Sequence, residues 1–159
     1  MIRTALTECF SDPVVQDIKY YNDNTLLPVE SFLESFTKEL DTITEQTNKK
    51  EMITKIDNVF IPTTTQAVEK LSAASPKTAP VKKINSDLLR AVKSLNESQI
   101  MAKEAYANMD EAKYNASELK RRDSMKNIME VYDDYKELAI KHKINLLDLK
   151  GYYDSSVKE

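Results

Sequence analysis

The chain has 159 residues and a formal net charge of −3, and 41% of its residues are hydrophobic while 31% are charged. This length suits one domain with its own core, and the charge balance is not the basic footprint of a nucleic-acid binder, so nucleic acid is not an expected partner. One glycine and five prolines leave little material for tight turns or phosphate-binding loops, so the composition predicts long helices.

The first predicted helix lies near residues 13–24. Asp12 offers a capping side chain and Pro13 stands at the first helical position, a combination that is typical of a helix start. Apolar residues then follow at spacings that place them on one helix face. The polar run at residues 22–25 is expected to end this helix.

The second predicted helix spans residues 28–60. Pro28 opens it, and apolar residues follow at steps of three and four, which predicts an amphipathic helix. The polar stretch at residues 44–51 fits either a loop or a solvated continuation, and we expect continuation because the apolar spacing resumes after it. Pro62 is expected to stop this helix, and a short third helix is expected near residues 65–72.

Residues 72–85 are predicted to form a flexible linker. They contain the only low-complexity stretch of the chain, which is rich in alanine, serine, proline and lysine. The linker joins an N-terminal helical segment, residues 1–71, to a long C-terminal helix or helix pair, residues 86–151, and the two are expected to pack as one domain. Residues 1–71 hold 7 Lys and Arg against 12 Asp and Glu, whereas residues 84–159 hold 13 against 14.

Residues 86–151 have the most regular apolar spacing of the chain. Nine residues alternate at steps of three and four, the spacing of a coiled-coil seam: Met125, Ile128, Tyr132, Tyr135, Ala139, His142, Leu146, Leu149 and Tyr153. A single helix of this length would reach about 95 Å. Residues 120–124 contain no helix breaker, so an unbroken, elongated form is favoured over a bend there. The predicted fold is an all-α, elongated antiparallel bundle or coiled-coil hairpin without β-sheet.

Two interpretations of this seam stay open. Tyrosine and methionine occupy positions that leucine or isoleucine would fill in a tight dimer. The tyrosine hydroxyl favours water or a polar partner, and methionine adapts to irregular surfaces. The seam is therefore either a boundary with another helix or chain, or an ordinary, partly buried core.

No catalytic, cofactor-binding or metal-binding residue is predicted. His142 is the only histidine, which excludes multi-histidine metal sites, and its place on the seam favours a packed or seam-edge histidine over a phosphorelay one. Cys9 lies near Glu8 and Asp12, carboxylates that disfavour the thiolate needed by a nucleophile, so an enzyme is not expected. The lone cysteine and the lack of an apolar run of about 20 residues predict a soluble, cytoplasmic protein.

Two short patterns suggest surface contacts or regulation. The run Lys120, Arg121 and Arg122 is either a solvated helix face or a basic patch for a phosphate-rich surface. Ser124 follows this run and fits a basic-directed kinase pattern, and Ser75, which precedes a proline, fits a proline-directed one. Both serines are candidate phosphorylation sites.

These observations favour a non-enzymatic helical scaffold or adaptor that binds protein partners and self-associates through the seam, as a homo-oligomer or a helical hetero-complex. The stretch at residues 26–34, together with the long helices after it, resembles the pattern of elongated BAR-type dimers. That resemblance implies a membrane-surface or curvature-associated dimer as an alternative. The acidic N-terminal segment suggests a second alternative, a chaperone-like or toxin-neutralising protein that covers a basic partner.

Overall fold

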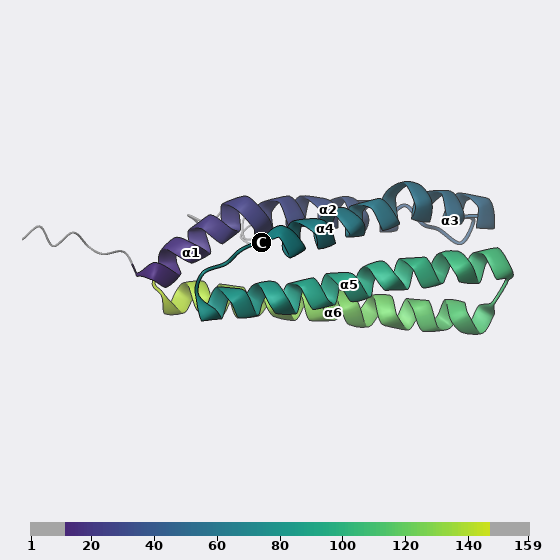
Figure 1. The fold of residues 1–159 in the computed structure, drawn as a ribbon. Coiled ribbons are helices and arrows are strands. Elements are labelled where there is room, and N and C mark those ends of the chain that lie inside the picture. The colour runs from purple at the N-terminus through teal and green to yellow at the C-terminus, as the bar shows by residue number, and fades with distance from the viewer. Residues whose placement is uncertain (1–11, 147–159) are drawn as a thin grey trace, which may run out of the picture.

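The computed structural model describes residues 12–146, and over these residues the chain forms a four-helix bundle without a strand (Figure 1). The first helix comprises α1 (Pro13–Tyr21), the π-helical segment η1 (Asn22–Leu26) and α2 (Leu27–Leu40). The second comprises α3 (Lys49–Lys55), the π-helical segment η2 (Ile56–Phe60) and α4 (Ile61–Ala73). The third and fourth are α5 (Ala79–Asn108) and α6 (Glu111–Lys141). The predicted all-α, elongated antiparallel bundle is confirmed.

Successive helices are neighbours in this bundle. α2 packs on α4, α4 on α5, and α5 on α6, while α1 also contacts the start of α5. The chain thus forms an N-terminal hairpin, residues 13–73, and a C-terminal hairpin, residues 79–141, lying side by side along their length (Figure 1). α2 and α5 are thus separated along this order by α4, on which both pack.

A continuous apolar core runs between the four helices. Phe36 of α2 and Phe60 of η2 are both buried and meet with ring centroids 4.9 Å apart. Ile18, Leu71, Leu88 and other fully buried side chains extend the core along the bundle. Burying one such side chain contributes roughly 1.5–3 kcal/mol, so the apolar stripes predicted from the sequence are what hold the helices together.

Two prolines lie inside continuous helices, which corrects the expectation that residues 22–25 and Pro62 are helix ends. Proline lacks an N–H group, and its ring collides with the carbonyl four residues earlier in an α-helix. Just before each proline the turn is widened: the Leu27 N–H bonds the Asn22 carbonyl, and the Ile61 N–H bonds the Ile56 carbonyl. A π-turn is a recognised way to absorb one extra residue, and it lets the helix pass the proline unbroken.

The two π-segments share a sequence pattern that the spacing of apolar residues does not reveal. Residues 23–28 read Asp-Asn-Thr-Leu-Leu-Pro, and residues 57–62 read Asp-Asn-Val-Phe-Ile-Pro. In both, the first apolar residue of the pair, Leu26 or Phe60, is buried in the core. The same local solution is therefore used once in each helix of the N-terminal hairpin.

The helix predicted over residues 28–60 is interrupted, contrary to expectation. α2 ends at Leu40, and residues 41–48 connect it to α3. Asn48 begins α3 with a capping box: its side chain accepts the Glu51 N–H at 3.0 Å, and Glu51 accepts the Asn48 N–H at 3.2 Å. An Asn followed three residues later by Glu is a helix-start signal, and it outweighs the resumed apolar spacing.

The connection between the hairpins is much shorter than the predicted linker. α4 ends at Ala73 and α5 begins at Ala79, so only residues 74–78 are non-helical. The buried carboxylate of Asp17 on α1 accepts the backbone N–H groups of Lys77 and Thr78 and the Thr78 hydroxyl, at 3.0, 2.7 and 2.7 Å. Burial raises the pKa of Asp17, but the hydrogen bonds from Thr78 and Lys77 outweigh it and hold that pKa below its usual value.

The helix-pair alternative is the one found for the C-terminal part, so the unbroken rod favoured from the sequence is wrong. The break lies at Met109 and Asp110 rather than at residues 120–124. Met109 takes a left-handed conformation with φ 55°, and Asp110 accepts the Lys113 N–H at 2.9 Å to start α6. A left-handed residue other than glycine costs about 1–2 kcal/mol. A methionine is therefore not expected at such a position, and the sequence does not predict this turn.

Candidate interaction surfaces

The predicted seam faces the interior of the bundle. Ile128, Tyr132, Tyr135 and Ala139 are buried, and Met125 and Leu146 are partly buried against the core. Leu149 and Tyr153 lie outside the described residues. The side chains of residues 125–146 on this stripe are thus covered largely by the chain's own helices, and a contact with another chain has to use other surfaces.

Polar groups inside the core join the two hairpins. The Tyr21 hydroxyl donates to the Asn85 side chain at 2.9 Å, and Asn85 donates to the Leu71 carbonyl at 3.2 Å. The Tyr135 hydroxyl donates to the Asn22 side chain at 3.3 Å. Burial raises the pKa of Tyr21 above its usual value, which keeps the hydroxyl protonated as a donor. These bonds fix the register of the hairpins, and the last of them gives a reason for the tyrosine at position 135 of the seam.

His142 caps the C-terminus of α6 rather than packing in the middle of the seam. Its Nδ1 atom lies 2.5 Å from a carboxylate oxygen of Asp12, the residue that caps α1. A hydrogen bond from the Val14 N–H and the contact with His142 lower the pKa of Asp12 below its usual value. The pair joins the first and last described helices at one end of the bundle.

The predicted basic patch is largely neutralised within the chain. Lys120 pairs with Glu97 of α5 at 2.6 Å, and Arg121 pairs with Glu118 at 2.8 Å. Arg122 is exposed. Two of the three cations therefore hold neighbouring side chains, and the run does not form a joint basic surface.

The two candidate phosphorylation sites differ in access. Ser124 has an exposed fraction of 0% and bonds the Ser94 hydroxyl at 2.8 Å and the Lys120 carbonyl at 2.7 Å. A kinase could reach it only after α5 and α6 separate, so the folded protein does not offer this site. Ser75 is exposed in the connection between the hairpins.

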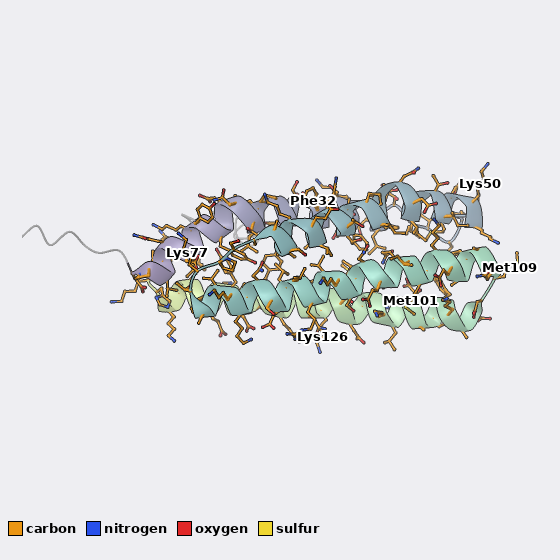
Figure 2. The ribbon with its side chains drawn as sticks, in the orientation of Figure 1. Phe32, Lys50, Lys77, Met101, Met109 and Lys126 are labelled. Atoms are coloured by element: carbon orange, nitrogen blue, oxygen red, sulfur yellow. The ribbon has the colours of Figure 1, made fainter. Side chains whose placement is uncertain are left out.

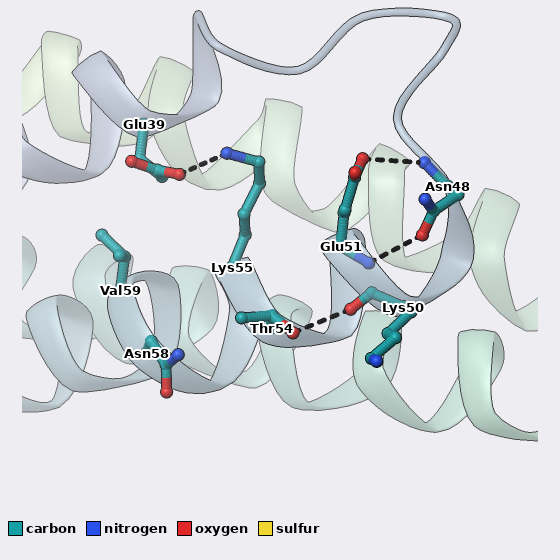
Figure 3. Close-up of a pocket in the computed structure, with 8 residues that line it drawn as sticks. All are labelled: Glu39, Asn48, Lys50, Glu51, Thr54, Lys55, Asn58 and Val59. Atoms are coloured by element: carbon teal, nitrogen blue, oxygen red, sulfur yellow. Dashed lines mark hydrogen bonds and ion pairs between the residues drawn. The ribbon is translucent and has the colours of Figure 1, made fainter.

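A hollow of about 560 Å³ lies beside α3 at the tip of the N-terminal hairpin (Figure 3). Its polar side chains bond one another: Lys55 pairs with Glu39 at 2.5 Å, Asn48 bonds Glu51, and the Thr54 hydroxyl bonds the Lys50 carbonyl at 2.9 Å. The Lys55–Glu39 pair fastens α3 to the end of α2, and the other two bonds lie within α3 and its N-cap. Within residues 12–146, no group of three or more His, Cys, Asp or Glu side chains could hold a metal ion.

Exposed apolar side chains are spread over several helices. Met109 at the tip is 82% exposed, and Leu119, Met129 and Ile140 are exposed on α6. Met109 and Lys126 project away from the bundle in Figure 2. Single exposed apolar residues are ordinary on protein surfaces, so they do not mark a binding surface. The distribution of charge separates the outer faces of the bundle more clearly than these residues do.

The N-terminal hairpin carries an acidic outer surface. Residues 12–73 hold 6 Lys against 11 Asp and Glu, a net charge of 6 − 11 = −5. Glu34 on α2 and Asp41, which caps the C-terminus of α2, are exposed, and Glu30 on α2 is half-buried. We call these three residues the acidic strip. Lys38 pairs with Glu34 at 2.8 Å, but both side chains remain largely in solvent.

The connection before α5 and the first half of α5 together carry the opposite charge. Residues 74–96 hold five Lys and Arg against one carboxylate, Asp87, which is a net charge of 5 − 1 = +4. Asp87 accepts both Lys83 at 2.5 Å and Arg90 at 2.9 Å, and the bond from Lys83 lowers the pKa of Asp87. Lys82, Arg90 and Lys93 are exposed on this helix; we call these three residues the basic strip.

The basic strip was missed because the sequence analysis assigned residues 72–85 to a linker. Once Lys82 is placed on the same helix as Arg90 and Lys93, spacings of eight and three residues bring all three near one side of it. The signal that could have revealed this is Pro80, since a proline is favoured in the first turn of a helix.

No family model matches this chain, and no curated protein or solved structure matches it either. Among the helices of residues 12–146, none combines the length and the apolarity needed to cross a bilayer.

Proposed function

We propose that this chain is a non-enzymatic scaffold or adaptor that binds other proteins through the charged outer faces of its bundle. The observation that carries the proposal is the separation of charge: the acidic strip lies along α2 to its C-terminal end and the basic strip lies on α5, and α2 packs on α4 rather than on α5. Two faces of opposite sign suit two partners of different charge, and both can be occupied at once.

The interior of the bundle supports this role. Its apolar side chains are buried against one another, and buried polar pairs such as Tyr21 with Asn85 link the hairpins. A bundle tied in this way presents its outer faces in a fixed arrangement. Complementary charge then speeds encounter and selects partners, and it makes binding sensitive to salt.

The place where this binding occurs is also a proposal. The sequence has a single cysteine, Cys9, and a chain that forms no internal disulfide suits a reducing compartment. We therefore propose that the partners are cytoplasmic proteins.

The test is affinity capture with variants that reverse each strip. The α2 variant carries Glu34→Lys and Asp41→Lys, and the α5 variant carries Lys82→Glu and Arg90→Glu. All four side chains are exposed, so the fold should be retained, and circular dichroism checks it. We expect proteins captured by the wild type at low salt to be lost from one variant or the other.

Matched controls lie on the outer face of α6. Glu130→Lys with Glu137→Lys repeats the seven-residue spacing and charge change of the α2 variant, and Lys126→Glu with Lys136→Glu repeats the charge change of the α5 variant; these four side chains are exposed as well. Capture that is unaffected by both strip variants, or equally reduced by the α6 controls, would refute the proposal.

A further inference from the structure

The acidic and basic strips of this chain are complementary to each other. Resting on the proposed function, we infer that one protein bound by the bundle is a second copy of the same chain, with the acidic strip of α2 in one copy docked against the basic strip of α5 in the next.

The two strips match in length. Glu30 and Asp41 are eleven residues apart along the first helix, and Lys82 and Lys93 are eleven residues apart along α5. Each interval spans about 17 Å at 1.5 Å per residue. A strip of one length can therefore lie along the other from end to end.

The intermediate charges also match when the two helices run antiparallel. Glu34 is seven residues from Asp41, and Arg90 is eight residues from Lys82, which differ by only about 1.5 Å along the axis. Antiparallel docking then places Asp41 opposite Lys82, Glu34 opposite Arg90, and Glu30 opposite Lys93. This single antiparallel register therefore forms three pairs of opposite charge.

Charge within each copy leaves the basic strip able to bind. Asp87 is the only carboxylate in residues 74–96, and it is already shared by Lys83 and Arg90. One carboxylate compensates at most one of these cations. Asp134 of α6 also acts on Lys83, but Lys83 lies outside the basic strip, which thus keeps a positive excess that an incoming acidic strip can neutralise.

The position of the strips decides the kind of assembly. α2 packs on α4 rather than on α5, so the same copy can offer its acidic strip to one neighbour and its basic strip to another. Such a head-to-tail contact uses different surfaces on the two partners and adds copies one after another unless a ring closes. Exposed ion pairs are individually weak and are screened by salt, so association should depend on concentration and ionic strength.

Sedimentation equilibrium of the purified full chain tests the inference. We expect the average mass to rise with protein concentration at about 20 mM salt and to fall to that of the monomer at about 500 mM, where charges more than a few Å apart are screened. The α2 and α5 variants should each be monomeric at low salt. In each variant the α2 strip and the α5 strip then carry charge of the same sign, so two copies repel each other. An equal mixture of the two variants should associate again, and so should one chain carrying all four substitutions.

Several results would overturn the inference. The wild type could stay monomeric at low salt, or the mixture of the two variants could stay monomeric. The α6 controls could also abolish association as fully as the strip variants do. Cosedimentation with phosphatidylserine vesicles covers the other occupant: vesicle binding that requires Lys82 and Arg90 while the free chain stays monomeric would assign the basic strip to an anionic membrane instead. A monomeric wild type that still captures other proteins through a strip would refute self-docking and leave the proposed function standing.

Discussion

Asp17 on α1 accepts the backbone N–H of Thr78 at 2.7 Å, and this bond ties the first helix of one hairpin to the start of the other. The carboxylate also takes the Lys77 N–H and the Thr78 hydroxyl, so it satisfies donors that lie just before the first turn of α5. A single buried side chain therefore controls how the connecting residues 74–78 lie against the bundle.

Replacing Asp17 with alanine should destabilise the protein by about 1–3 kcal/mol, because it leaves the N–H groups of Lys77 and Thr78 without their acceptor. Urea unfolding followed by circular dichroism measures the loss. Asp133→Ala, which removes an exposed carboxylate from α6, is the control and should change stability by less than about 0.5 kcal/mol. Equal stability of the two variants would contradict a tying role for Asp17.

Stability should fall in acid partly through Asp17. Its pKa is held below the usual value in the folded state, so the folded carboxyl binds its proton less readily than the unfolded one does. Its contribution is therefore fully present above the unfolded pKa of about 3.9 and is lost as pH falls through the lower folded pKa. Measured between neutral pH and about pH 2, Asp17→Asn should flatten the acid limb of the stability curve, while an unchanged limb would rule this linkage out.

Negative charge should be tolerated at one candidate phosphorylation site and not at the other. Ser124→Asp places a carboxylate where the native hydroxyl has no solvent exposure and bonds Ser94, and an unpaired buried charge costs about 3–5 kcal/mol. Ser75→Asp adds the same charge at an exposed position and should stay within about 0.5 kcal/mol of the wild type. Thermal unfolding of both variants makes the comparison, and a stable Ser124→Asp protein would show that α5 and α6 open readily.

The π-segment η2 can be tested by removing the residue it absorbs. Deleting the exposed Asn58 should turn this part of the helix into a regular α-helix and bring Pro62 into conflict with it. Adding Pro62→Ala to the deletion should then restore about 3 kcal/mol, the usual cost of a proline in a helix interior. If the alanine brings no gain, the widened turn has another cause than the proline.

Much of the architecture follows from residue spacing, and the reasons for the exceptions are specific. The steps of three and four from Met125 onward predict a helix with one apolar face, and α6 has that face in the core as far as Ala139. The helix ends at Lys141, earlier than the predicted end at residue 151. Periodicity describes one helix at a time, so it could not tell whether a helix of the same chain or of another would cover that face.

Helix boundaries were the least predictable feature, because the residues that usually mark a helix end did not mark one here, or were absent where a helix does end. Pro28 and Pro62 read as boundaries until the widened turns before them are known, and these depend on hydrogen bonds that no spacing reveals. The turn at Met109 lacks the glycine that normally marks a left-handed residue. The basic strip stayed hidden for the same reason, since finding it required α5 to begin at Ala79.

The contact between Asp12 and His142 means that the chain enters and leaves the bundle at the same end. The turn at Met109 lies at the far end, about 45 Å away along the 30 residues of α5. A circular permutant that is opened between Met109 and Asp110 and closed near Asp12 and His142 would therefore retain every helix of residues 12–141. A protein fused at that new opening would be carried on the opposite pole of the rod from one fused beside Asp12.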